Sequence, residues 1–151
     1  MSPLDIRQGG LGNCWFLSAA SSLAEVPGRL ENIFLNNDNE LNAAGIYGFN
    51  FYTLGVKHTV IVDDWLPLKG DEGNYKTIFA KVGRDDSLWG ALLEKAFAKH
   101  HGNYQHLSGG SPGAAARTLL GGPFETIKHK DSTVRELWNK LLEHDGKNDI
   151  L

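Results

Sequence analysis

A glycine-rich segment that runs directly into an apolar stretch constrains this chain more than any other feature. The segment is Gln8-Gly9-Gly10-Leu11-Gly12-Asn13-Cys14-Trp15-Phe16-Leu17. Asn13 belongs to the residue types that favour the N-cap position, so the pattern predicts a helix whose first residue is Cys14. This helix is expected to continue to about Glu25, because Pro27-Gly28 would end it.

Cys14 is the only cysteine of the chain. A thiol at the first turn of a helix suits a thiolate nucleophile, because the partial positive charge of the helix N-terminus favours the anion. Gln8 precedes a flexible loop, and its side-chain NH2 is placed to donate to an oxyanion during acyl transfer. The alternative is an inert buried thiol, which is the usual state of a lone cysteine in a helix. The Gly-x-Cys-Trp string favours the nucleophile, since it surrounds the reactive cysteine of papain-like enzymes.

The whole glycine-to-cysteine segment closely resembles the nucleophile segment of calpains, which are intracellular cysteine endopeptidases. Val60–Pro67 resembles the calpain strand that ends in Val-Asp-Asp-x-Leu-Pro. Leu88–Lys99 resembles the calpain helix Trp-x-Ala-Leu-Leu-Glu-Lys-Ala-Tyr-Ala-Lys, and Leu120-Gly121-Gly122 follows in the expected order. Separate motifs in the right order are more specific than any single motif.

The resemblance extends from about Asp5 to Gly122 and is weaker beyond. It implies that residues 1–151 form the first of the two subdomains of a calpain protease core, the one that carries the nucleophile. The implied fold is a papain-like α+β lobe, mostly helical, with a central nucleophile-bearing helix and a small antiparallel sheet.

Composition supports an ordinary globular domain. The chain has 151 residues, 41% of them hydrophobic, and a net charge of −3, which gives no reason to expect a nucleic-acid partner. No apolar stretch approaches the length of a membrane span, so no integral membrane segment is expected. A single cysteine excludes an intrachain disulfide and fits a reducing, cytoplasmic or intracellular setting.

Apolar periodicity along the chain also predicts a mixture of helices and strands. The predicted elements after the first helix are a short helix over Arg29–Leu35, strands over Ile46–Leu54 and His58–Val62, a loop over Lys69–Lys76, a short third strand over Thr77–Ala80, and helices over Ser87–His101, from Ser111-Pro112 to Gly121-Gly122, and from Thr133 to near Asp145-Gly146.

A papain-type nucleophile requires an imidazole base that is oriented by an Asn or Asp. His144 has nearly the expected separation from Cys14, but it ends an amphipathic helix, where the helix dipole favours a histidine. In calpains the histidine instead begins a glycine-flanked strand of the second subdomain. The remaining histidines also lack this pattern; they are His58, His100 and His101 near a strand and a helix end, and His106 and His129 in loop-like segments.

The resemblance therefore implies protein substrates and a second protease subdomain, outside this chain, that supplies the histidine and an asparagine. The chain alone is expected to be inactive as a peptidase. The alternative is a non-enzymatic, calpain-like module for protein interaction or regulation.

Calcium is also implied by the resemblance, because calpain cores bind this ion through oxygen ligands. Asp5 occupies the position of the family's aspartate nine residues before the nucleophile. Ser87 stands where the family has a glutamate, with Asp85 and Asp86 as adjacent substitutes, and only four residues precede Asp5. These departures weaken the expected site. The alternative for Asp5 is a solvated loop carboxylate.

The remaining charged motifs have simpler interpretations. Asp63-Asp64 is an acid/base or metal candidate, but its place between a strand and Leu-Pro favours a turn. Glu94 and Lys95 are expected to be helix-surface charges. The histidines and the cysteine lack the spacing of a zinc site, so no transition metal is expected.

Overall fold

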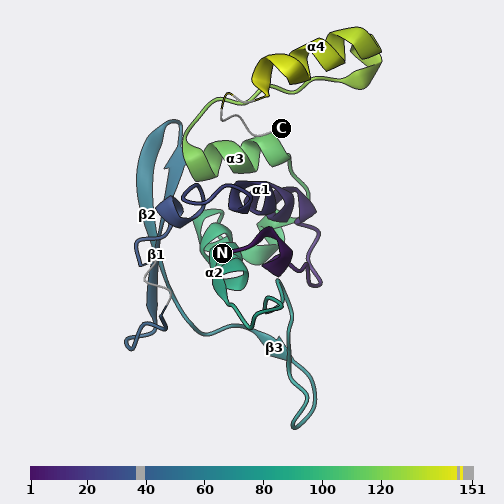
Figure 1. The fold of residues 1–151 in the computed structure, drawn as a ribbon. Helices are drawn as coiled ribbons and strands as arrows, with labels where there is room; N and C mark the ends of the chain where they lie inside the picture. The colour runs from purple at the N-terminus through teal and green to yellow at the C-terminus, as the bar shows by residue number, and fades with distance from the viewer. Residues whose placement is uncertain (37–39, 146, 148–151) are drawn as a thin grey trace.

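The computed structural model describes residues 1–36, 40–145 and 147, and shows an α+β fold with a helical body flanked by a narrow antiparallel sheet (Figure 1). The α-helices are α1 (Cys14–Ala24), α2 (Trp89–His100), α3 (Pro112–Leu120) and α4 (Val134–His144). The strands are β1 (Ile46–Thr53), β2 (Val56–Asp63), β3 (Leu68–Lys69) and β4 (Lys76–Thr77), and the 3-10 helices are η1 (Pro3–Asp5), η2 (Glu31–Ile33), η3 (Tyr104–Leu107) and η4 (His129–Asp131).

The core lies where α1, α2 and β1 meet. Phe16 of α1 stacks on Phe97 of α2 with ring centroids 4.1 Å apart, and Phe51 of β1 meets Phe97 edge to face at 5.7 Å. All three rings are fully buried. Their burial anchors α1 against α2 and β1, and so fixes the position of its N-terminal residue Cys14.

The predicted pair of strands is confirmed, although the turn predicted over residues 55–57 lies at Leu54-Gly55 and the second strand already begins at Val56. β1 pairs antiparallel with β2 from Ile46↔Asp63 to Thr53↔Val56. The two turn residues, Leu54 and Gly55, both have positive φ, at 51° and 80°, as a tight two-residue hairpin turn requires. The predicted third strand is misplaced, because β4 ends at Thr77 and pairs only with β3 in a separate two-stranded sheet.

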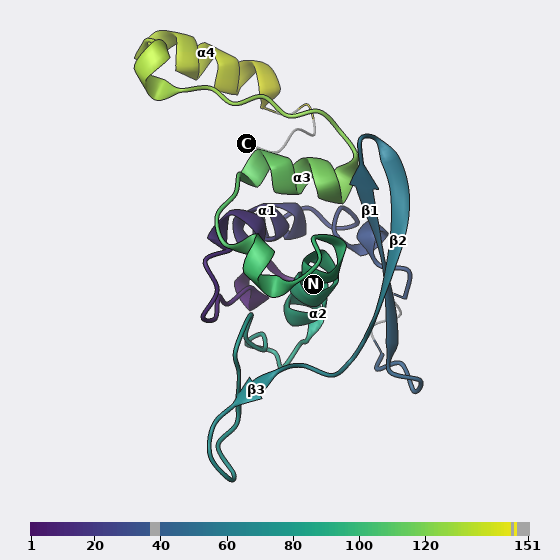
Figure 2. The same cartoon turned by 180° about the vertical axis from the view of Figure 1, so that it is seen from behind.

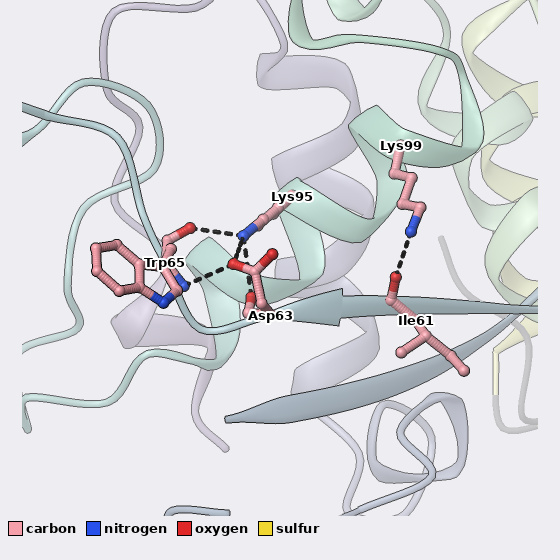
Figure 3. Close-up of polar contacts among 5 residues, drawn as sticks. All are labelled: Ile61, Asp63, Trp65, Lys95 and Lys99. Atoms are coloured by element: carbon pink, nitrogen blue, oxygen red, sulfur yellow. Dashed lines mark hydrogen bonds and ion pairs between the residues drawn. The ribbon is translucent and has the colours of Figure 1, made fainter. Parts of the chain in front are cut away.

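Two lysines of α2 hold the outer edge of β2 (Figure 3). Lys99 Nζ donates to the Ile61 carbonyl at 2.7 Å, and Lys95 Nζ donates to the carbonyls of Asp63 and Trp65 at 3.0 and 2.6 Å. The Asp63 carboxylate accepts from Lys95 and from the Trp65 N–H, and the hydrogen bond from Lys95 lowers the pKa of Asp63. The turn interpretation of Asp63 is confirmed, whereas Lys95 is a structural cross-link and not merely a surface charge.

The helix predictions hold with small shifts of their ends. α1 begins at Cys14 as expected. Gly121 caps the C-terminus of α3 in the left-handed conformation, with φ 77°. The capping box of α4 is present, since Thr133 and Glu136 bond to each other's backbone N–H. His106 and His129 lie in short 3-10 helices and not in loops. The helix predicted over Arg29–Leu35 is reduced to the 3-10 helix η2. Gly146, the predicted end of the last helix, lies outside the described residues.

α4 projects from the body beyond α3 (Figures 1 and 2). None of its residues is buried, and four large apolar side chains are exposed on it, namely Val134, Trp138, Leu141 and Leu142. Such an amphipathic helix leaves its apolar side without cover from the described part of the chain. Over that part, helices fall short of the length and apolar character that crossing a membrane requires.

Candidate active site

Cys14 is exposed at the N-terminus of α1, at the end of a segment that we call the cysteine loop, residues 7–14. Gln8 is also exposed, and its Nε2 donates to the Leu11 carbonyl at 2.7 Å across the loop. A side-chain amide has two N–H groups, so this bond leaves a second donor on Gln8. The cysteine loop therefore presents a thiol and an amide donor to solvent.

One side of the cysteine loop is seated on the backbone of residues 78–81. The Gly10 N–H donates to the Ile78 carbonyl at 2.9 Å, and the Lys81 N–H donates to the Arg7 carbonyl at 2.8 Å. Between these two bonds, a Cβ on Gly9 would lie 1.7 Å from the Phe79 carbonyl oxygen. Only glycine permits this approach of two backbones.

The other side of the loop is held by the segment that follows α2. The Gly109 N–H donates to the Gly12 carbonyl at 3.0 Å, and Trp15 Nε1 donates to the Leu107 carbonyl at 2.8 Å. A Cβ on Gly110 would lie 2.3 Å from the Trp15 ring. The half-buried Trp15 thus fixes the first turn of α1 against a close-packed glycine.

Asn13 and Glu94 meet beneath the cysteine loop. Asn13 sits at the N-cap position, but its side chain makes no capping hydrogen bond and is fully buried. Asn13 Nδ2 instead donates to Glu94 Oε1 at 2.6 Å, while Glu94 Oε2 accepts from the Ala80 N–H at 2.7 Å. Side-chain capping by Asn13 was a wrong prediction, although the helix does begin at Cys14.

Glu94 is the residue that sequence reasoning missed. It was expected on the helix surface, but it is 1% exposed, and burial raises the pKa of its carboxyl group although both hydrogen bonds oppose that rise. The spacing along the helix indicates this burial, because Glu94 lies three residues after Ala91 and three before Phe97, on the buried side of α2.

Three of the histidines form hydrogen bonds to groups other than Cys14. His101 Nδ1 pairs with the Phe97 carbonyl at 3.0 Å, His106 Nδ1 with the His101 carbonyl at 2.7 Å, and His100 Nε2 with Thr53 Oγ1 at 3.2 Å. Burial, followed by the neighbouring His101 and His58, lowers the pKa of His100. His144 ends α4, and α3 lies between α4 and α1 in both views (Figures 1 and 2).

Asp5 has a different environment from the one expected of a solvated carboxylate. It is 6% exposed, and its Oδ2 accepts from the Ser2 N–H at 3.0 Å and from Trp89 Nε1 at 3.2 Å. Asp5 and Asp85 both lie beside Gly83, where an added Cβ would be 2.9 Å from the Asp5 Cβ, 2.9 Å from Asp85 Oδ1 and 2.4 Å from Ser87 Oγ. Across the described residues, His, Cys, Asp and Glu side chains form no group of three that could hold a metal ion.

Comparisons with known proteins identify the family to which the sequence is similar. The sequence profile described as calpain family cysteine protease matches residues 1–151. The chain is 37% identical over 147 residues to the calpain-type cysteine protease DEK1 of Arabidopsis thaliana. This alignment covers 93% of the chain and 7% of the relative. It is 39% identical to Calpain-5 of Caenorhabditis elegans, over 83% of this chain and 20% of the relative. It is also 39% identical to Calpain-12 of Homo sapiens, over 84% of this chain and 17% of the relative. The chain thus spans a fifth or less of the length of these relatives.

Proposed function

This chain belongs to the calpain family of cysteine proteases, and from that membership we propose that residues 1–151 are the nucleophile-bearing subdomain of an endopeptidase that cleaves proteins. The observation that carries the proposal is the exposed Cys14 at the N-terminus of α1, in a loop that is fixed on both sides and from beneath. The helix N-terminus favours the thiolate that the reaction requires.

In the proposed reaction, the Cys14 sulfur attacks the carbonyl carbon of a peptide bond. The backbone N–H of Cys14 and the free N–H of the Gln8 amide donate to the oxyanion that forms. The carbon–nitrogen bond then breaks, the amine leaves with a proton from an imidazolium, and water hydrolyses the thioester. In this proposal the histidine and its orienting asparagine come from a second subdomain, because His100, His101 and His106 bond to other groups and His144 lies on α4.

Two exposed features support a second subdomain as partner. Cys14 and Gln8 face solvent, as the two halves of a shared cleft would before they meet. The apolar side of α4 is uncovered, which is typical of a surface that packs against further polypeptide. An intracellular setting also belongs to the proposal, since a catalytic thiol requires a reducing environment.

The test is a kinetic comparison in a polypeptide that joins this chain to a histidine-bearing second subdomain of the same family. Gln8→Ala is expected to lower kcat by about 100- to 1,000-fold with little change in KM, because the lost donor acts mainly on the oxyanion. Ser18→Ala is the matched control, because Ser18 is an exposed residue of α1 one turn beyond Cys14. Equal kcat in Gln8→Ala and Ser18→Ala would refute the role of Gln8 as an oxyanion donor. Absence of turnover in the unchanged joined polypeptide would favour the non-enzymatic interaction module.

The residues present do not fit a complete calcium site. Calcium takes six to eight oxygen ligands. Around Gly83 the chain offers Asp5, Asp85 and the neutral Ser87, and one Asp5 oxygen already accepts from two N–H donors. The proposed reaction therefore uses no step that involves calcium.

Calcium is accordingly expected to bind the 151-residue chain weakly or not at all. Isothermal titration calorimetry with calcium chloride should show no one-to-one binding at micromolar concentrations. The reason is that so few charged ligands do not offset the free energy lost when the ion gives up its hydration shell. Replacing Ser87 with Glu should strengthen any binding, since it restores a carboxylate at this place. Tight binding by the unchanged chain that is lost in Asp85→Asn would contradict the expectation and identify Asp85 as the compensating ligand.

A further inference from the structure

Glu94 carries a buried carboxylate on α2, in contact with the residue that precedes Cys14. Its hydrogen-bond donors are two neutral groups, the Asn13 amide and the Ala80 N–H. Burying an ionisable group costs considerable free energy even when it is hydrogen-bonded, and an apolar side chain of similar size would fill the same space without that cost. Packing alone therefore does not account for a carboxylate at this position.

We propose that Glu94 is a positioning residue for the Cys14 nucleophile, acting through the Asn13 side chain and the Ala80 backbone. This inference rests on the proposed role of Cys14. One carboxylate oxygen contacts the cysteine loop directly, and the other contacts the segment on which the loop is seated. Oε1 holds Asn13 next to Cys14, and Oε2 holds Ala80, which lies in the segment 78–81 that bonds to Arg7 and Gly10 on either side of Gln8. One planar group thereby sets the spacing between the amide donor and the thiol.

The orientation of Asn13 shows how this control reaches Cys14. The Asn13 carbonyl accepts from the Phe16 and Leu17 N–H groups, so Asn13 defines the start of α1. Its side chain turns away from the helix end and into the interior, which gives up a capping bond worth about 1 kcal/mol. It also keeps a partially negative capping oxygen away from the helix terminus where the oxyanion is proposed to form. Glu94 secures that orientation, one peptide unit from Cys14.

The hydrogen-bond chemistry of this contact defines the informative substitutions. Asn13 Nδ2 and the Ala80 N–H both donate, so residue 94 must supply two acceptors, and the buried Asn13 Oδ1 has no hydrogen-bond partner among the described residues. In Glu94→Gln, the Gln oxygen can accept from Ala80, and its NH2 can donate to Asn13 Oδ1 once the Asn13 amide turns over. Glu94→Met has a similar length and offers neither bond.

The experiment measures two rates in each variant. One is alkylation of Cys14 by iodoacetamide in the 151-residue chain, which needs no peptidase activity. The other is kcat in the polypeptide joined to a second subdomain. Glu94→Met and Asn13→Ala are expected to slow alkylation by about 2- to 5-fold, the size of a helix-terminus effect. They are expected to lower kcat by about 10- to 100-fold with little change in KM, because the reacting groups are misplaced and not removed.

Two further variants separate positioning from general loosening of α2. Glu94→Gln is expected to recover most of both rates. Leu93→Ala removes a fully buried neighbour on α2, and should lower the urea midpoint while leaving the alkylation rate of the folded chain unchanged.

The proposal is overturned if Glu94→Met alkylates like the unchanged chain, if Glu94→Gln is as slow as Glu94→Met, or if Leu93→Ala slows alkylation equally. Asn13→Ala keeps the test decisive should Glu94→Met fail to fold. Absence of turnover in the unchanged joined polypeptide would refute the proposed function, while the alkylation series would still decide the role of Glu94.

Discussion

The 151-residue chain alone is expected to react with at most one equivalent of a peptide ester per Cys14 and to show no multiple turnover. The thiolate is available for one attack, but protonation of the leaving group and hydrolysis of the thioester both need a general acid or base. His100, His101 and His106 bond through ring nitrogens to Thr53, to the Phe97 carbonyl and to the His101 carbonyl, respectively. Lack of such a group typically costs about 100- to 10,000-fold in rate.

Addition of a histidine-bearing second subdomain of the same family, joined or in trans, is expected to restore steady-state turnover. That turnover should disappear in Cys14→Ser and Cys14→Ala and persist in His144→Ala. The measurement is product release from a fluorogenic peptide under excess substrate. Multiple turnover by the isolated chain that His144→Ala abolishes would make His144 the base and would place α4 over the cysteine loop in solution.

The parts of the fold that the sequence predicted are those specified by neighbouring residues. The start of α1 at Cys14 and the end of α3 at Gly121 follow from local residue types. The strands β1 and β2 follow from their apolar pattern, although their turn lies at Leu54-Gly55 and not over the predicted residues 55–57. Caps, tight turns and periodicity are short-range properties, so one sequence is sufficient to recognise them.

The parts that the sequence did not predict depend on contacts between distant segments. Asn13 has the residue type of a cap, but its side chain bonds to Glu94, 81 residues away, so tertiary structure overrides the local preference. Local sequence predicts a surface position for Glu94, because a carboxylate is rarely buried without a cation. The solvated alternative for Asp5 failed for the same reason, since Trp89 covers and binds it from 84 positions away.

Gly9→Ala is expected to have the largest effect of any single methyl group added to the cysteine loop. The new Cβ would lie 1.7 Å from the Phe79 carbonyl oxygen and 2.8 Å from that of Ile78. Both obstacles are backbone atoms, so the loop itself must move away. That movement would break the bond from Gly10 to Ile78 and the bond from Lys81 to Arg7. Two lost hydrogen bonds and the residual crowding together predict a loss of about 3 kcal/mol in the free energy of unfolding.

Gly12→Ala in the same loop is the matched control, because an added Cβ there has no atom within 4 Å. Both substitutions restrict the unfolded chain to the same degree, so their difference isolates the contact with residues 78–81. Urea unfolding should show Gly9→Ala well below Gly12→Ala in stability, and kcat of the joined polypeptide should fall only in Gly9→Ala, since Gln8 moves with its neighbour. Equal stability of the two variants would mean that the cysteine loop is not seated on residues 78–81. The spacing between Gln8 and Cys14 would then have to be set by Asn13 and Trp15 alone, through their bonds to Glu94 and Leu107.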